Sequence, residues 1–402
     1  MRIPSTSFAF TLLLGALAAV PYSGIDINLP ALAATGAALG ASASSVGLTM
    51  SVFVLSLAVM PLLYGPASDR FGRKPIVLFG ILVFVVGSVA CAVARSLAEL
   101  LASRVVQGIG AAATGTIFAI IRDLFDAHAA RIKIANVTVA VNVATMIAPT
   151  AGAALLALGD WRLIYAVQAG VGVILLLAVL TGFSESAKLD KAVRPSAAIV
   201  SSYRRVLTHP VSFGYVLVGA AAGATVFAYV SGASLFFIGV VGLRPDQYGL
   251  IFSACSAAVM CGAFLDGRLG LRGMASAVVL ATGLKLMTAA SLVLLAVTLG
   301  GVRSPALFAG LLILVALAFG LSFPNVMNAT MQPLPDIAGA VSAAAGSVQL
   351  TAGAVSSGLV SLLFDGRSAL SMSAVMALCS SLGWAAYVLI ARPAEQGSQR
   401  TP

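Results

Sequence analysis

A short segment between two long apolar runs carries four charged residues within six positions, namely Asp69, Arg70, Arg73 and Lys74. Gly65 lies four residues before the acid, and Gly72 permits a tight turn between the two arginines. Only 9% of the residues in the chain are charged. A cluster of this density therefore needs a physical reason. It can form ion pairs and helix-end contacts that hold one conformation and release it in another. A topogenic positive cluster, the alternative, explains the basic residues but neither the acid nor the glycines.

An acidic partner for these arginines is available later in the chain. Asp123 follows Arg122 at the end of another apolar run. The predicted topology puts this run end on the same side of the membrane as the charged segment, so Asp123 is a candidate partner for Arg70 or Arg73.

Three charged residues lie inside apolar runs, at Asp26, Arg104 and Lys285. Charge within a bilayer is costly and usually functional. Asp26 is about 18 residues into the first run, roughly 27 Å at the helical rise of 1.5 Å per residue, and Arg104 reaches a similar depth. An acid that faces a cavity can bind a proton or a cation, and a nearby arginine would tune that competition. The sequence assigns no role to Lys285.

The position of Asp26 permits two interpretations. Asp26 is either a loop residue at the outer end of a shortened span or a functional group beside a cavity. Pro21 and Gly24 favour the second interpretation, because they would break the helix next to the acid.

The apolar run at 134–157 contains a second interruption. Pro149 removes a helical hydrogen bond, and Gly152 thins one face of the helix. Such a helix can rock against a neighbour, although a purely structural kink is the competing interpretation.

Membrane-spanning helices must position these groups. The chain is 60% hydrophobic with a mean hydropathy of +1.06, and many of its apolar windows are long enough to cross about 30 Å of hydrocarbon. The short alternating strands of a membrane barrel are not visible. We predict an all-α polytopic membrane protein with twelve transmembrane helices at 8–30, 46–64, 75–94, 100–121, 134–157, 162–183, 212–239, 248–266, 274–299, 305–328, 338–363 and 369–391.

A repeat of the charged segment indicates two similar halves. Gly65-x-x-x-Asp69 recurs 197 residues later as Gly262-x-x-x-Asp266, again at the end of the second span of its half. We therefore expect two pseudo-symmetric six-helix bundles, at 1–183 and 211–402. A cytoplasmic linker at 184–210 would join them as a solvated segment without activity of its own. In such duplicated folds, substrate binds near the midplane where the halves meet.

The basic residues predict the orientation. With both termini inside, sixteen of the 23 lysines and arginines fall in inner segments and five in outer ones, as the cytoplasmic bias of positive charge requires. The net charge of +10 thus reflects topology rather than a nucleic-acid-binding face. We interpret Phe8–Val20 as part of the first span and not as a secretion signal, because eleven further spans follow.

Other functional classes lack the residues that they need. The four cysteines fall within predicted spans without metal-type spacing, so we expect neither a disulfide nor a bound metal. No catalytic triad, phosphate loop or pore-lining polar stripe is visible in the sequence. We therefore predict neither an enzyme nor a channel, and no cofactor.

Together the motifs resemble those of a transporter family. The segment from Gly65 to Lys74 resembles the loop signature of the major facilitator superfamily between its second and third spans. Similarity to Bcr/CflA-type drug-resistance transporters extends to four further segments, namely Gly24–Leu32, Arg104–Gly108, Ile121–Leu124 and Pro324–Ser342. These matches are spread over most of the chain.

The resemblance implies export of drug-like compounds in exchange for protons, with Asp26 as the proton or cation acceptor and Arg104 as the residue that tunes it. It also implies a fifth-span antiporter motif that contains Pro149 and Gly152. The implied cytoplasmic gate consists of Gly65, Asp69, Arg70, Gly72, Arg73, Lys74 and Asp123. The chain departs from the family at three positions: alanine replaces glycine at Ala148 and Ala153, and Asn28 replaces a bulky methionine.

The expected mechanism is alternating access with exchange, in which protonation of Asp26 from outside competes with substrate and promotes its release. A proton-driven importer or facilitator of a small nutrient or metabolite on the same fold is the alternative. We expect a monomer in the bacterial inner membrane whose partners are drug-like small molecules, protons and lipid, without nucleic acid. Candidate residues of the substrate cavity are Asn142, Phe236, Asn325 and Asn328.

Overall fold

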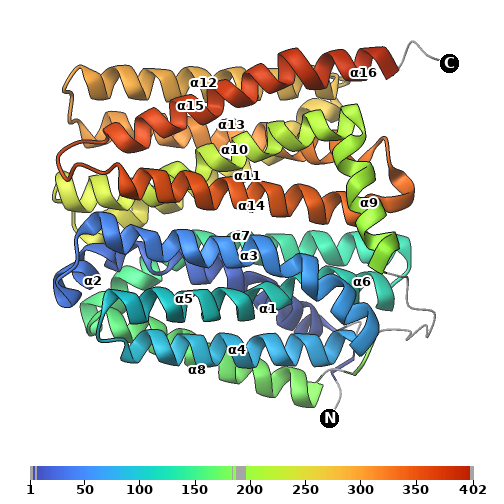
Figure 1. The fold of residues 1–402 in the computed structure, drawn as a ribbon, viewed down its shortest axis with the longest axis horizontal. Helices are drawn as coiled ribbons and strands as arrows, with labels where there is room; N and C mark the ends of the chain where they lie inside the picture. Colours follow the sequence, from blue (N-terminus) through green and yellow to red (C-terminus); the bar gives the residue numbers. More distant parts are fainter. Residues whose placement is uncertain (1–2, 5–6, 183, 187–195, 399–402) are drawn as a thin grey trace. The chain divides into compact units, whose positions relative to one another are not determined.

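Residues 3–4, 7–182, 184–186 and 196–398 are described by the computed structural model of this chain, and they contain helices but no β-strand. Figure 1 shows the helices as long rods that run back and forth. Twelve of them, counted with the short turns that continue them, are long and apolar enough to cross a membrane. The prediction of an all-α membrane protein with twelve spans is therefore confirmed for the described residues.

The chain forms two compact units. The first contains Met1–Val193 and Pro245–Ser253, and the second contains Arg194–Arg244 and Ala254–Pro402. The break after residue 193 falls inside the segment predicted as the linker. The predicted halves do not include the assignment of Pro245–Ser253 to the first unit. This stretch begins the helix Pro245–Leu271, which belongs to the second half of the sequence.

The first unit is built mainly from the helices that precede the linker. Two 3₁₀ turns, Leu29–Ala31 and Ala113–Thr116, join α1 to α2 and α5 to α6. In this unit α1 packs on α7, α4 packs on α5 and α8, and α3 packs on α5. The helix bounds are α1 Phe8–Asp26, α2 Leu32–Leu39, α3 Ala43–Phe71, α4 Arg73–Val93, α5 Leu97–Ala112, α6 Ile117–Leu124, α7 Ala127–Leu158 and α8 Trp161–Gly182.

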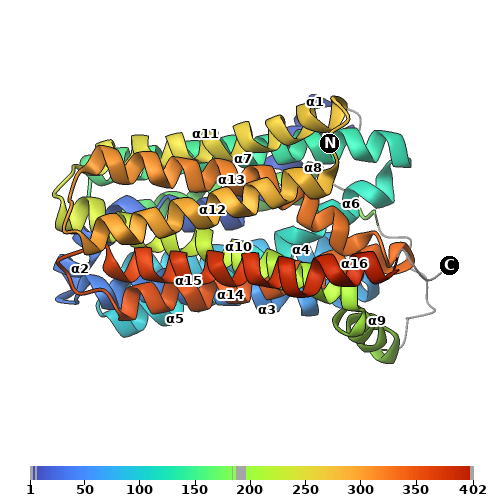
Figure 2. The same ribbon diagram turned by 90° about the horizontal axis from the view of Figure 1, so that it is seen from above.

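The second unit has α10 at its centre. This helix packs on α13, α14 and α15, while α12 packs on α13 and α15 (Figure 2). π-helical turns at Leu235–Val240 and Tyr387–Ala391 extend α10 and α15. The helix bounds are α9 Ser196–Thr208, α10 Pro210–Ser234, α11 Pro245–Leu271, α12 Ser276–Leu299, α13 Pro305–Met331, α14 Ala338–Leu362, α15 Leu370–Ala386 and α16 Arg392–Ser398.

Each unit begins and ends at the same end of its own bundle. In the first, the backbone N–H of Ile3 donates to the carbonyl of Gly182 over 3.0 Å, so the chain start lies beside the end of α8. In the second, the hydroxyl of Tyr215 near the start of α10 donates to Glu395 of α16 over 2.6 Å. Each unit therefore crosses its bundle an even number of times, as six spans require.

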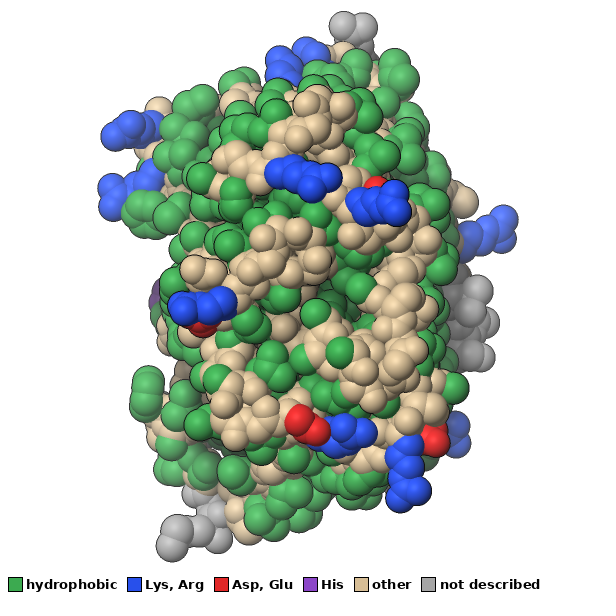
Figure 3. Space-filling view, turned by 90° about the vertical axis from the view of Figure 1, so that its left-hand side faces the viewer, with side chains coloured by type: hydrophobic (Ala, Val, Ile, Leu, Met, Phe, Trp, Pro, Cys, Tyr) green, Lys and Arg blue, Asp and Glu red, His purple; other side chains and the backbone are tan. Residues whose placement is uncertain are grey.

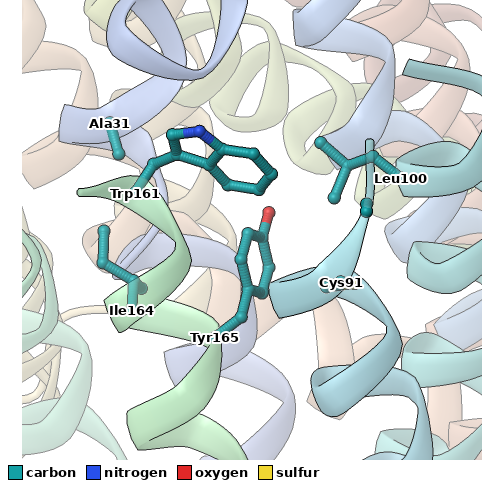
Figure 4. Packing of buried hydrophobic residues seen from close by; sticks show 7 residues of the cluster. Ala31, Cys91, Leu100, Trp161, Ile164 and Tyr165 are labelled. Carbon is teal, nitrogen blue, oxygen red and sulfur yellow. The ribbon is translucent and has the colours of Figure 1, made fainter. Parts of the chain in front are cut away.

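Aromatic packing fixes α8 against α4 and α5 in the first unit. Trp161 and Tyr165 of α8 stand edge to face, with ring centroids 5.9 Å apart. Figure 4 shows these two side chains beside Cys91 of α4 and Leu100 of α5, and Ala31 lies in the same buried cluster. Cys91 is thus packed as a small apolar side chain, as its place in a predicted span suggests.

The linker is not wholly solvated, which corrects the expectation for its second part. α9 is amphipathic: Val206 is fully buried and Tyr203 partly buried in one apolar cluster of the second unit. Arg205 of the same helix is exposed and pairs with Asp336 over 2.8 Å. Residues 187–195 of the predicted linker lie outside the described residues.

Figure 3 views the end at which α2 lies, where lysine and arginine side chains occur singly or in small groups among hydrophobic and other side chains, some of them beside acidic side chains.

Candidate functional site

A turn with positive φ joins α3 to α4 at the charged segment. Gly72 has φ 99° and ψ 154°, a conformation that residues with a side chain rarely adopt. α3 ends at Phe71 and α4 begins at Arg73, so the turn consists of this one residue. Gly72 thus makes the tight turn that its place in the sequence predicts.

Arg73 is the centre of the ion pairs at this turn. Its Nη1 lies 2.6 Å from Asp69 Oδ1, and its Nε lies 3.0 Å from Asp123 Oδ2 on α6. Its side chain is 14% exposed, compared with 26% for Asp123 and 64% for Asp69. Of the two arginines that the sequence offers as partners for Asp123, Arg73 is therefore the one in contact. Arg70 is exposed, and its guanidinium lies over a neighbouring phenylalanine ring.

Glu185 holds the first turn of α4 from the other side. Its two carboxylate oxygens accept hydrogen bonds from the backbone N–H groups of Arg73 and Lys74, at 2.9 and 3.1 Å. These N–H groups have no partner within the helix, and the helix dipole favours negative charge at this end. A Cβ on Gly72 would lie 2.5 Å from the same carboxylate, which is a second reason for glycine there. Glu185 thereby fixes the end of the α8 segment to the charged turn.

Arg104 is buried and binds backbone carbonyls. Its side chain on α5 is 1% exposed, donates from Nη1 to Gly24 O over 3.1 Å and from Nε to Thr49 O over 3.3 Å. The guanidinium also lies 4.1 Å from the ring centroid of Phe53, within the range of a cation–π contact. Because Gly24 lies in the last turn of α1, Arg104 caps a helix end whose carbonyls carry partial negative charge.

A chain of buried side-chain amides holds Arg104 in place. Gln107 Oε1 accepts from Arg104 Nη1 over 2.6 Å, and Gln107 Nε2 donates to Ser88 Oγ and to Gln168 Oε1, at 2.8 and 2.6 Å. All four side chains are at most 5% exposed, and they come from α4, α5 and α8. In low dielectric such a network fixes one arrangement, because breaking any bond leaves a buried polar group unpaired.

Asp26 is the last residue of α1 and is 6% exposed. The described residues give its carboxylate no hydrogen bond and no ion pair within 4.0 Å, so Arg104 acts on the same helix end without pairing with the acid. Pro21 lies inside α1, which corrects the expectation that it breaks the helix. The break follows the acid instead, where Asn28 Nδ2 donates back to Gly24 O over 2.9 Å.

Gly152 brings α7 against the residue that follows Asp26. A Cβ on Gly152 would collide with the backbone carbonyl of Ile27, so only glycine permits this approach. Pro149 lies inside the same helix one turn earlier. The two residues of the predicted antiporter motif are therefore adjacent to the end of α1, where the buried acid lies.

The second copy of the charged motif has different contacts. Asp266 accepts a hydrogen bond from Asn325 Nδ2 of α13 over 2.6 Å, whereas Asp69 in the first copy pairs with Arg73. Arg268 lies over a phenylalanine ring at 4.9 Å. Asn325, a candidate cavity residue, is thus engaged with the motif of its own unit.

The other candidate cavity residues have different environments. Phe236 is 2% exposed and stacks with Phe308 at a centroid distance of 4.5 Å. Asn142 is partly buried, and Asn328 is exposed.

Glu185, Ser88 and Gln168 are members of the site that sequence reasoning missed. Glu185 meets the α4 turn across 112 positions of the chain, and Gln168 meets Gln107 across 61. No local pattern marks such contacts. The motif Arg104-x-x-Gln107 was the available signal for the network, since spacing i, i+3 puts both side chains on one helix face.

Comparison with known proteins gives a consistent result. The family profile described as "Major Facilitator Superfamily" matches residues 11–357. A protein named "Bicyclomycin resistance protein homolog" from Haemophilus influenzae is 27% identical over 397 residues, which is 97% of this chain and 98% of that protein. "Multidrug resistance protein D" from Escherichia coli is 27% identical over 363 residues, 88% of each chain. The crystal structure of a "POT family transporter in complex with 5-aminolevulinic acid" superposes with a TM-score of 0.77 at 14% identity, covering 98% of both chains, and supports the fold alone.

Proposed function

This chain belongs to the Major Facilitator Superfamily, and on that premise we propose that it exports drug-like small molecules in exchange for protons. The chain is a transporter rather than an enzyme, and two relatives of nearly full length are named for drug resistance. Export would proceed by alternating access, with the two six-helix units as the parts that move.

The observation that carries the proposal is the buried carboxylate of Asp26, which pairs with no residue in the described part of the chain. A carboxylate away from water needs a partner, and the described residues supply none within 4.0 Å. A proton or a substrate donor can fill that role, but not both at once. Competition between them couples proton entry to substrate release, and no chemical reaction on the substrate is needed.

Arg104 and Gly152 serve this exchange by holding the end of α1. Arg104 fixes the Gly24 carbonyl, and Gly152 lets α7 lie directly against Ile27. A shift of α7 at its proline would therefore move the backbone beside Asp26 and change how strongly the acid holds its proton. The coupling is the difference in proton affinity between the two conformations.

The charged turn is proposed as the cytoplasmic gate. Arg73 joins α3, α4 and α6, and Glu185 adds the end of the α8 segment, so that four helix ends form one body. Such a body moves as a unit, and the exposed Arg70 offers it a charge for contacts that change between states. Gly65, Asp69, Gly72, Lys74 and Asp123 complete this gate.

The chain is a multi-pass membrane protein, and its finer placement belongs to the proposal. The bias of basic residues supports cytoplasmic termini and insertion in the bacterial inner membrane. A monomer would suffice, because both units of an alternating-access transporter are present in one chain.

A drug-susceptibility panel tests the proposed function. The chain and its Asp26→Asn variant would be expressed in an efflux-deficient bacterial host and challenged with compounds that include bicyclomycin. An exporter raises resistance to at least one compound, and Asp26→Asn abolishes the gain at equal protein level. No gain for any compound, together with proton-driven uptake of a nutrient by the same cells, would replace export with import.

A further inference from the structure

Lys285 is an intramembrane charge that the proposed transport cycle does not use. It is the tenth residue of α12 and is exposed. Its exposed neighbours on the same helix face, at spacings of three and four residues, are Val278, Thr282, Ala289 and Leu292. A single lysine thus lies in a mostly apolar, exposed stripe of α12, where an isolated charge is costly.

The described residues do not neutralise this charge. No carboxylate of the described residues lies within 4.0 Å of the Lys285 ammonium. Its contact is the indole ring of Trp384 on α15, whose centroid lies 5.4 Å from Nζ. The indole N–H of Trp384 has no acceptor among the described residues either, and Trp384 is partly exposed. Two hydrogen-bond donors therefore lie side by side, and the described part of the chain supplies no acceptor for either.

Helix geometry favours an ammonium directed toward the end of the bundle where α12 begins. Side chains of a helix lean toward its N-terminus. Trp384 lies one turn before Tyr387, and the hydroxyl of Tyr387 donates to the carbonyl of Ala277, the second residue of α12, over 3.3 Å. This direction would let Lys285 lay its stem along apolar surface and extend its head toward the membrane boundary on that side, as snorkelling lysines do.

The same corner carries further positive charge and a track of apolar side chains. Arg392 at the start of α16 and Arg272 just before α12 are both exposed. Leu378 and Leu382 of α15 are 58% and 56% exposed. α12 and α15 pack on each other and run side by side in both ribbon views (Figure 1, Figure 2). The basic side chains suit the phosphate of a phospholipid, and the exposed apolar side chains of α12 and α15 suit its acyl chains.

We propose that Lys285 and Trp384 form a binding site for an anionic phospholipid, with its phosphate at the two donors and its acyl chains along the exposed faces of α12 and α15. A zwitterionic lipid brings a cationic head group next to Lys285 and is therefore bound more weakly. One lysine at a membrane surface corresponds to about fivefold in favour of anionic lipid. Free phosphate lacks the acyl chains and does not occupy the site.

Fluorescence quenching can test the site, because the chain contains two tryptophans, Trp161 and Trp384. Trp161→Phe leaves Trp384 as the single fluorophore. The variant would be reconstituted in phosphatidylcholine vesicles that contain a small fraction of brominated phosphatidylglycerol or of brominated phosphatidylcholine. We expect Trp384 to be quenched at about fivefold lower fraction of the anionic lipid. Lys285→Gln should remove this preference and Lys285→Arg should keep it.

Controls separate the site from general effects. Arg367→Gln changes an exposed cation in the loop between α14 and α15 and should leave the preference intact. Should Trp161→Phe fail to fold, the same comparison is made between the native chain and Trp384→Phe, whose remaining Trp161 is 1% exposed and should not distinguish the lipids. Equal quenching by both lipids, an unchanged preference in Lys285→Gln, or full competition by inorganic phosphate would overturn the proposal.

Discussion

Replacing the two carboxylates that share Arg73 should have unequal effects on stability. Asp69 is the closer partner at 2.6 Å, and Asp123 lies at 3.0 Å. Distance alone would make Asp69 the more important residue. Exposure reverses this order, because 64% of the Asp69 side chain and only 26% of the Asp123 side chain is exposed.

The magnitudes follow from this difference. An exposed pair at spacing i, i+4 contributes about 0.3–0.5 kcal/mol, and solvent screening reduces it further. A charged hydrogen bond that is mostly shielded contributes about 1.5–3 kcal/mol. The pair of Arg73 with Asp123 also joins two different helices, because these residues are 50 positions apart in the sequence. Asp69 lies only one helical turn from Arg73. We expect Asp123→Asn to cost about 1–2 kcal/mol and Asp69→Asn at most about 0.5 kcal/mol.

Thermal unfolding in detergent measures both variants. With about 2–4 °C per kcal/mol for units of this size, Asp123→Asn should lower Tm by roughly 2–8 °C and Asp69→Asn by about 2 °C or less. Asp336→Asn is a matched control, because its pair with Arg205 is 57% and 53% exposed and should also have a small effect. A loss of Tm in Asp69→Asn equal to or larger than that in Asp123→Asn would refute the ranking by exposure.

Two further predictions concern the contacts around the charged turn and the end of α1. Glu185→Ala removes the acceptor of two N–H groups at the start of α4 and should cost about 1 kcal/mol, seen as a lower Tm; an unchanged Tm would mean that water replaces the carboxylate without loss. Gly152→Ala should abolish transport while the protein still accumulates in the membrane, because a Cβ there collides with Ile27. Gly170→Ala, where a Cβ meets open space, should leave transport intact, and equal transport by both variants would remove the proposed role of Gly152.

The sequence predicted the spans because hydrocarbon thickness sets both their length and their composition. It did not predict how the first span ends. The apolar run continues through the 3₁₀ turn Leu29–Ala31 into α2, and the candidate span extends to Leu39 rather than stopping near residue 30. Hydropathy does not respond to such a turn, since its residues are as apolar as those of a helix.

The packing of the linker segment was also not predicted from the sequence. Its polar composition favours a solvated segment, and Arg204 and Arg205 of α9 are indeed exposed. Tyr203 and Val206, three residues apart, nevertheless place an apolar stripe on one side of the helix, and Val206 is fully buried. One pair of apolar residues at a spacing of three gives only a weak periodic signal, so the packing could not be predicted from composition.

At the candidate site, spacing selected the residues, and long-range contacts decide which groups they touch. The motif at Gly65–Lys74 identified Arg73 but not Glu185, which lies 112 residues further along the chain. The predicted depth of Arg104 in the membrane suggested that it lies near Asp26. In the structure its guanidinium instead binds the carbonyls of Gly24 and Thr49. A buried arginine has five donors, and helix-end carbonyls can satisfy them where an isolated carboxylate cannot.

The most direct test of the account is substrate-induced proton release from the purified protein. A compound that the susceptibility panel identifies as a substrate would be added to the protein in lightly buffered detergent solution with a pH indicator. We expect the native chain to release protons on binding and Asp26→Asn, although folded and able to bind the compound, to release none. Proton release of equal size from Asp26→Asn would contradict the claim that this carboxylate exchanges a proton for substrate.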